Sequence, residues 1–222
     1  MLRGSMNVRP LLVLCCLLSV LPPASGSASP ASSAELLVQQ GQQMEAEGNE
    51  LVALQRYRDA ISLDGTSELA YLRLGALRAK RNELLEAESV YDVGLGRVPA
   101  SVDLLLGRAR VRRARGHFFE AHDDLRRAAQ LEGTSSSARE LAIARETIAL
   151  ARDARLQATE LSAWRRVLAI GHKSGDEALV HEASIQTRAL GLFVGEVDPV
   201  LGGRALGDPL RKSLASVARR GG

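Results

Sequence analysis

The sequence predicts an all-α protein: a solenoid of antiparallel helix pairs with degenerate capping helices at its C-terminal end. Three observations lead to this prediction. Small residues recur every 34 residues, helix-breaking residues recur in the same frame, and no segment shows the sustained alternation of apolar and polar residues that marks a β-strand. Of the 222 residues, 45% are apolar but only 3% aromatic, so the core must be mainly aliphatic.

Residues 1–26 have the layout of a secretory signal peptide. Arg3 and Arg9 form a positively charged start, and residues 11–21 form an apolar run. Two prolines and several small residues follow, so cleavage is expected before Ser27. The alternative is a membrane anchor, but a span needs about 20 apolar residues and this run has eleven.

Both cysteines, Cys15 and Cys16, lie inside this apolar run. Lipid attachment to one of them is a further alternative, disfavoured because neither cysteine follows a small residue. The chain has no thiol after residue 16, which excludes thiolate catalysis, Cys-based zinc sites and internal disulfides from the remainder. Residues 27–33 consist mainly of Ser, Ala and Pro and are expected to form a flexible leader.

The 34-residue period starts at Ala34. Positions 8, 20 and 27 of each repeat are small, position 24 is large, and positions 15 and 32 mostly hold residues that end helices. The small residues are Gly41, Gly75 and Ala109 at position 8, Ala53, Ala87 and Ala121 at position 20, and Ala60, Gly94 and Ala128 at position 27. The large residues at position 24 are Tyr57, Tyr91 and Leu125. The helix-ending positions hold Gly48, Asn82 and Gly116 at position 15, and Gly65, Pro99 and Gly133 at position 32. Small residues allow two helices to pack closely, and the large residue fills the space between pairs. One pair cannot bury its apolar face alone, so the pairs must stack.

These residues and their spacing resemble the tetratricopeptide repeat (TPR) family, with repeats at 34–67, 68–101 and 102–135. The resemblance covers 102 of the 222 residues and implies a solenoid of two-helix repeats. Two positions depart from the family pattern, which usually has a large apolar residue at position 7 and an aromatic residue at position 11. Here these positions hold Gln40, Leu74 and Arg108, and Met44, Arg78 and Arg112.

Capping residues mark the expected helix starts. Ser32 and Glu35 have the spacing of a capping box before the first repeat. Thr66 and Ser101 are expected to cap the first helices of the second and third repeats.

Residues 136–195 lose the small-residue pattern but keep apolar stripes with helical spacing. We expect a degenerate helix pair and a capping helix, because a bare solenoid end would expose its apolar face. These helices are expected at about 138–152, 154–172 and 176–193. Ser137 and Ser174 each precede a glutamate by three residues and are expected to open the first and the third of them.

Residues 196–222 are expected to form a loop followed by a basic amphipathic helix. Asp208 would cap this helix, with Pro209 in its first turn. Its apolar face would carry Leu210, Leu214 and Val217, and its cations are Arg211, Lys212, Arg219 and Arg220.

No motif in the sequence indicates catalysis. The patterns G-x-x-x-x-G-K-[ST], G-x-S-x-G and H-E-x-x-H are absent. The four histidines do not have metal-ligand spacing, and the carboxylates are scattered along predicted helix faces, where i, i+4 pairing accounts for them. We therefore expect no enzyme activity, no metal site and no cofactor.

The charge distribution argues against nucleic acid as a partner. The formal charge is +3, and residues 1–26 contain two of the cations and no acid, so the remainder is close to neutral. Residues 107–116 hold five arginines without interleaved aromatic residues for base stacking. Arginine greatly outnumbers lysine, which suits a GC-rich bacterial genome and, with the signal peptide, a periplasmic or secreted location.

The TPR resemblance implies a concave groove, lined by the first helix of each repeat at positions 2, 5, 9, 12 and 13. The candidate binding residues at these positions are Gln42, Glu45, Leu72, Lys80, Arg110 and Arg113. The groove would grade from acidic through aliphatic to basic, which suits an extended or helical peptide with an acidic segment. The alternative is a solvated face whose arginines pair with Glu120, Asp123 and Asp124. The two-carboxylate clamp of chaperone-docking TPR domains is absent.

The sequence thus predicts an exported, non-catalytic scaffold or adaptor that binds a protein or peptide in the cell envelope. The alternative from another class is a structural spacer that docks on an anionic membrane surface through residues 208–220. Nothing in the sequence sets the oligomeric state.

Overall fold

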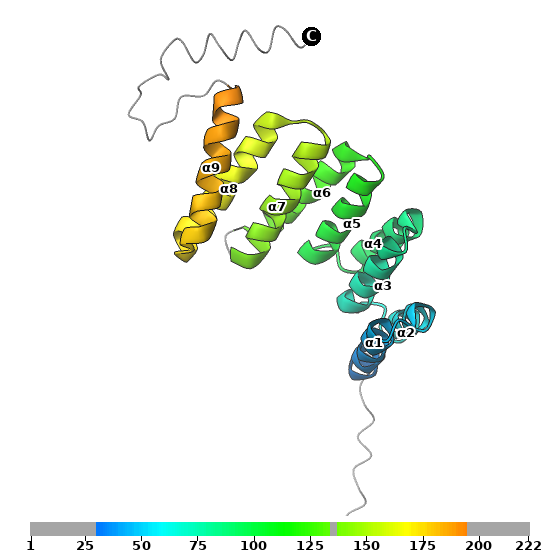
Figure 1. Cartoon of the computed structure of the whole chain (residues 1–222). Coiled ribbons are helices and arrows are strands. Elements are labelled where there is room, and N and C mark those ends of the chain that lie inside the picture. The colour runs from blue at the N-terminus through cyan, green and yellow to red at the C-terminus, as the bar shows by residue number, and fades with distance from the viewer. Residues whose placement is uncertain (1–29, 134–136, 195–222) are drawn as a thin grey trace, which may run out of the picture.

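The computed structural model describes residues 30–133 and 137–194, which contain α-helices and no strand (Figure 1). The helices are α1 (Pro30–Ala46), α2 (Glu50–Leu63), α3 (Glu68–Lys80), α4 (Leu84–Arg97), α5 (Val102–Ala114), α6 (Phe118–Glu132), α7 (Ser137–Asp153), α8 (Gln157–Ser174) and α9 (Glu177–Val194). The predicted all-α solenoid is confirmed. The predicted signal peptide and the segment 196–222 lie outside the described residues.

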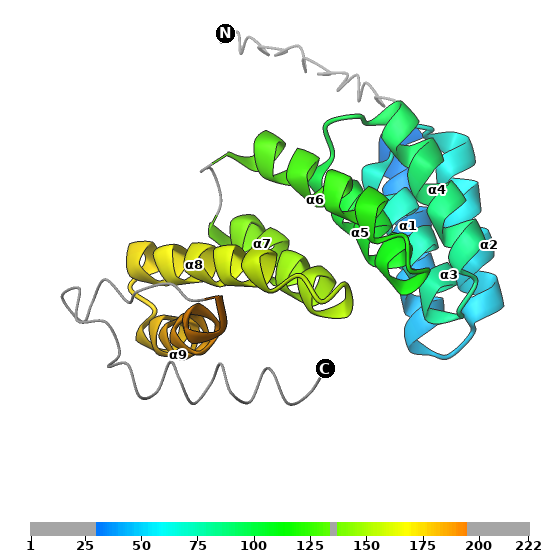
Figure 2. The same cartoon turned by 90° about the horizontal axis from the view of Figure 1, so that it is seen from above.

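The helices pack in two layers. Each first helix (α1, α3, α5, α7) pairs with the helix that follows it, and each of α2, α4 and α6 also contacts the first helix of the next pair. The first helices contact one another in order along the solenoid, whereas the second helices share no such contacts within the described chain. The first helices therefore form the inner layer and the second helices the outer layer (Figure 2). Helix α9 packs along α8 at the C-terminal end.

One turn conformation joins the two helices of every pair. Gly48, Asn82 and Gly116, at position 15, have φ angles of 82°, 62° and 80°. In each turn the next residue donates its backbone N–H to the carbonyl five residues back, at 2.8–2.9 Å. Arg155 has the same conformation, with φ of 57°, and Leu156 donates to Ala151 at 2.7 Å. This fourth turn comes 39 residues after Gly116 instead of 34, so a fourth pair is present in a shifted frame.

The strained turn residue Arg155 gives a prediction. Arg155→Gly is expected to raise the free energy of unfolding by about 0.5–1 kcal/mol, because the left-handed conformation costs an L-residue about 1–2 kcal/mol and glycine adopts it freely. Denaturant unfolding of the two proteins measures the difference. The control is Arg145→Gly in the interior of α7, which should lower the free energy of unfolding by about 1 kcal/mol. A loss in both variants would contradict the strain.

Of the two residues expected to cap the first helices of the second and third repeats, Ser101 does so and Thr66 does not. Ser101 caps α5, because its Oγ accepts the backbone N–H of Leu104 at 3.0 Å. Helix α3 is instead preceded by Ser67. Thr66 donates to Asp64 through its backbone N–H at 2.9 Å and its hydroxyl at 2.7 Å, which holds it in the turn before the cap.

Two further capping predictions are wrong. Helix α1 already runs at Pro30, so the last four residues of the predicted leader 27–33 are helical and Ser32 lies inside the helix. Proline at the start of a helix loses no hydrogen bond, which allows this earlier start. Helix α9 is capped by Asp176, whose carboxylate accepts the N–H of Leu179 at 3.0 Å, and Ser174 is the last residue of α8.

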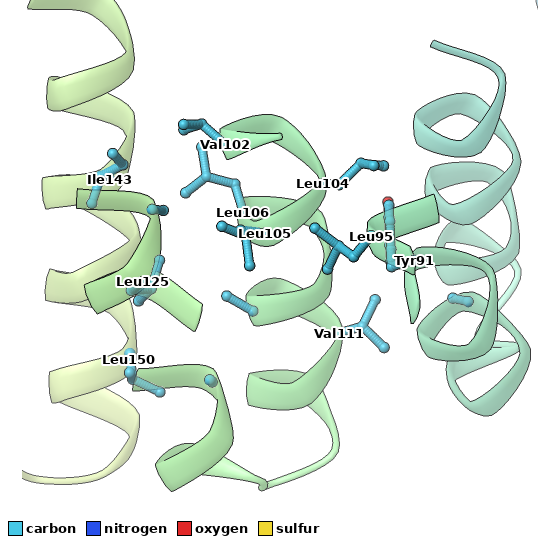
Figure 3. Close-up of a cluster of buried hydrophobic side chains, with 14 of the residues drawn as sticks. Tyr91, Leu95, Val102, Leu104, Leu105, Leu106, Val111, Leu125, Ile143 and Leu150 are labelled. Carbon is cyan, nitrogen blue, oxygen red and sulfur yellow. The ribbon is translucent and has the colours of Figure 1, made fainter. Parts of the chain in front are cut away.

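The core is built on the predicted contrast of small and large residues. Tyr91 is 3% exposed and belongs to a cluster of buried side chains from α3 to α7 (Figure 3). Its ring lies between Gly75 and Gly107, where an added Cβ would stand 2.6 Å from a ring carbon in either case. Trp164, buried in α8, takes the corresponding place in the shifted fourth repeat. No described helix is long and apolar enough to cross a membrane.

Candidate binding surface

The six predicted binding residues all lie on inner-layer helices. Gln42 and Glu45 are on α1, Leu72 and Lys80 are on α3, and Arg110 and Arg113 are on α5. They come from three consecutive helices that contact one another, so the structure places them along one layer. Their contacts differ, however, and decide which of them can reach a ligand.

Leu72 is mainly a packing residue. It is half-buried and contacts the same apolar cluster as Tyr91. Val38 and Leu106, which share its position 5, are buried as well, so this position faces the seam between helices rather than the surface. The aliphatic side chain exposed at the start of α3 is Leu69, at position 2 of the repeat and 44% exposed. Leu69 occupies one of the expected groove positions but is not among the six candidate residues.

Gln42 and Glu45 are engaged by neighbouring helices. With its amide oxygen turned toward Arg73, Gln42 accepts from Nε and Nη2 of that residue at 2.8 and 2.9 Å. Glu45 accepts the hydroxyl of Tyr57 at 3.0 Å. Burial raises the pKa of Tyr57, and the hydrogen bond to Glu45 raises it further. These contacts fix α1 against α2 and α3.

Lys80 lies at the end of α3 in a charged cluster that joins the first two pairs. Its Nζ is 3.0 Å from the carboxylate of Glu50 and 4.0 Å from that of Glu45. Arg81 also reaches Glu50, at 3.2 Å. The hydrogen bonds from Lys80 and Arg81 lower the pKa of Glu50. Lys80 is therefore exposed but already paired.

Arg110 and Arg113 share one face of α5 and reach across to α7. Arg110 donates through Nε to Glu146 at 2.6 Å, and Arg113 donates through Nη1 to Asp153 at 2.6 Å. Arg113 Nη2 also lies 3.8 Å from Glu146. The side chain of Arg110 is 54% exposed, and Nε of Arg113 is buried without an acceptor.

The other arginines of residues 107–116 point away from this face. Arg108 and Arg112 both donate to Asp124, which is 3% exposed, and Arg112 also donates to Glu88 at 2.8 Å. Arg115 pairs with Glu88 as well. Burial alone would raise the pKa of Glu88, but the hydrogen bonds from the two arginines outweigh it and lower this pKa.

The expected pairing of these arginines with acids on α6 is thus correct for Asp124 and wrong for Asp123 and Glu120. Asp123 pairs with Arg126, three residues further along the same helix. Glu120 forms no ion pair within residues 30–133 and 137–194. The acids that hold Arg110 and Arg113 are on α7, one pair further along the solenoid. The departures from the family pattern at positions 7 and 11 of the third repeat also have a cause, because Arg108 and Arg112 bury their charge against Asp124.

Comparison with known proteins adds evidence on the fold. No family model and no curated protein matches the sequence, but solved structures do. A tetratricopeptide repeat protein from Parabacteroides merdae is 15% identical with a TM-score of 0.56, over 76% of this chain and 61% of that chain. The fold is a TPR solenoid. PilF of Pseudomonas aeruginosa is 14% identical with a TM-score of 0.56, over 86% of this chain and 92% of that chain. A MamA double mutant (RS-1) is 15% identical with a TM-score of 0.51, over 65% of this chain and 78% of that chain.

Within this TPR solenoid the inner layer presents charged and apolar side chains. The described residues hold no group of three or more His, Cys, Asp or Glu side chains that could bind a metal ion. The groups best placed for a ligand are the exposed Arg110 and Leu69 and the partly exposed Arg113. Such groups can bind a carboxylate and an aliphatic side chain of a polypeptide.

Proposed function

We propose that this chain is an exported, non-catalytic TPR scaffold that binds a protein or peptide on its inner layer. The observation that carries this proposal is the Arg110 guanidinium. It makes its one described hydrogen bond through Nε, and its side chain is 54% exposed, so its two terminal nitrogens are available to a carboxylate. Arg113 stands beside it, attached to the same Glu146, with a buried Nε that lacks an acceptor.

The acids on α7 set the strength of this site. Glu146 and Asp153 already neutralise the two arginines, so a ligand carboxylate adds to or exchanges with an existing ion pair. A ligand must therefore also gain energy from apolar contact, for which Leu69 on α3 is available. This combination supports a polypeptide with an acidic and an aliphatic side chain over a small anion.

The double change Arg110→Ala, Arg113→Ala tests this function. Charge-assisted hydrogen bonds contribute about 1.5–3 kcal/mol each, so the partner should bind at least about tenfold more weakly. The measurement is quantitative affinity purification from the cell-envelope fraction of the native organism, followed by calorimetry with the recovered partner. Circular dichroism establishes that the variant is folded.

The matched control is Arg126→Ala on the outer-layer helix α6, where the side chain is 64% exposed and pairs with Asp123 of the same helix. Arg112 would be a poor control, because its guanidinium is held by Glu88 and Asp124. Equal retention of partners by wild type and the double variant would show that the inner-layer arginines do not bind them.

Export gives an independent prediction. N-terminal sequencing of the native protein should begin near Ser27, because residues 1–26 combine a basic start, an apolar run and small residues before the expected cut. The control is a variant with Leu14→Arg and Leu17→Arg in the apolar run, which should keep Met1 and stay in the cytoplasm. Mature wild-type protein that still begins at Met1 would contradict cleavage.

A further inference from the structure

Exposed apolar side chains mark one edge of the solenoid, away from the inner layer. Leu51, Leu85 and Phe119 stand at position 18 of successive repeats and are 70%, 65% and 83% exposed. Leu156, at the start of α8, is 49% exposed. Each of the four follows the turn that joins the two helices of its pair. These four residues are termed the turn edge.

The unpaired charge beside the turn edge is mainly negative. Glu47, Glu86 and Glu120 are exposed and form no ion pair within the part of the chain that the structure describes, and Arg155 is the cation there without one. The other charged residues of these turns take part in ion pairs; they are Glu50, Lys80, Arg81, Glu83, Arg115 and Asp153. A complementary ligand would combine an apolar face with flanking cations.

We propose that the turn edge at Phe119 and Leu156 binds residues 208–220 of the same chain. By sequence this segment carries three aliphatic residues with helical spacing, surrounded by four cations and a single acid. It is thus complementary in both apolar pattern and charge to an exposed phenylalanine beside the unpaired Glu120.

The topology brings this segment to the correct side of the solenoid. Helix α9 runs back along α8 and ends at Val194, on the same side as the turn between α7 and α8 (Figure 1). Residues 195–208 number 14 and can span at most about 46–50 Å. Phe119 lies in the first turn of α6, three helices before α9, and neighbouring helix axes lie about 8–10 Å apart. The segment therefore reaches Phe119 easily and Leu85, two helices further, only when almost fully extended.

The tether makes binding within one molecule favourable. A short tether that can span the distance between two sites gives an effective concentration in the millimolar range. A contact whose dissociation constant lies below this concentration would then be occupied most of the time. Binding of the segment would cover Phe119, the most exposed large apolar side chain of the described residues.

Cysteine crosslinking in the full chain tests the proposal, because the only thiols are Cys15 and Cys16, which are first changed to serine. Phe119→Cys and Leu214→Cys are combined and treated with a short bis-maleimide at low protein concentration. We expect the crosslink to close within one molecule at least tenfold faster than in the control pair Leu131→Cys, Leu214→Cys. Leu131 is 44% exposed on the same helix, 12 residues and about 18 Å further along its axis.

Charge reversal provides the second readout. Glu120→Lys should slow the crosslink between residues 119 and 214 several-fold, and adding Arg211→Glu and Lys212→Glu should restore its rate. Circular dichroism establishes that every variant is folded. Equal rates for the two cysteine pairs, no effect of Glu120→Lys, or a crosslink that joins two molecules would each overturn the proposal.

Discussion

Tyr91→Ala is expected to lower the free energy of unfolding by about 3–5 kcal/mol, the range for removing a buried aromatic side chain. The ring is 3% exposed and joins α3, α4 and α5, so its loss weakens the packing within the second pair and between the second and third pairs. Gly75 and Gly107 face the ring and have no side chains that could move into the cavity. Denaturant unfolding followed by circular dichroism measures the loss.

Three variants separate this packing from other effects. Tyr91→Phe keeps the ring and should cost less than about 1.5 kcal/mol. Burial raises the pKa of Tyr91 to about 12, so its hydroxyl stays neutral near pH 7. Gly107→Ala, with a Cβ 2.6 Å from the ring, should cost about 1–3 kcal/mol. Gly96→Ala on the same helix as Tyr91 meets open space and should gain about 0.5–1 kcal/mol. A loss for Tyr91→Ala no larger than for Tyr91→Phe would contradict this account.

The repeat could be read from sequence because the residues that define it act locally. A small residue at position 8 and a left-handed residue at position 15 each meet a fixed neighbour in the same pair, so a period of 34 appears in the chain. The period fails after residue 135 because α6 is one residue longer than α4 and α7 is four residues longer than α3 and α5, which together give the shift of five residues. A search that allowed the frame to shift would have placed Trp164 with Tyr57 and Tyr91.

The ion pairs and the burial of the candidate binding residues could not be predicted from sequence in the same way. Arg110 and Arg113 looked like free cations because the acids considered were those of the next helix. The acids that pair with them are 36 and 40 residues away, on α7, the inner-layer helix of the next pair. An ion pair between adjacent repeats has roughly the spacing of the repeat itself, and that spacing was the available signal. Leu72 differs, because its burial comes from packing against the apolar cluster that also contains Tyr91.

Asp124→Ala is expected to lower the free energy of unfolding by about 3 kcal/mol, the low end of the range for breaking a buried ion pair. The carboxylate is 3% exposed and accepts from Arg108 at 2.6 and 3.0 Å and from Arg112 at 2.8 Å. Its removal leaves two half-buried guanidinium groups without their main acceptor. The loss stays near the low end because Arg108 keeps Asp92 and Arg112 keeps Glu88.

The neighbouring residue gives the matched control. Asp123→Ala removes a carboxylate that is 55% exposed and pairs with Arg126 within the same helix, so it should cost no more than about 0.5 kcal/mol. Replacing the whole cluster by Arg108→Met, Arg112→Leu and Asp124→Leu should recover most of the loss, because well-packed apolar groups can replace a buried ion pair without net cost. Unfolding curves in urea at pH 7 compare the four proteins. If Asp124→Ala and Asp123→Ala shift the curve equally, the cluster does not hold α5 against α6, and Arg108 and Arg112 become candidates for an anion site instead.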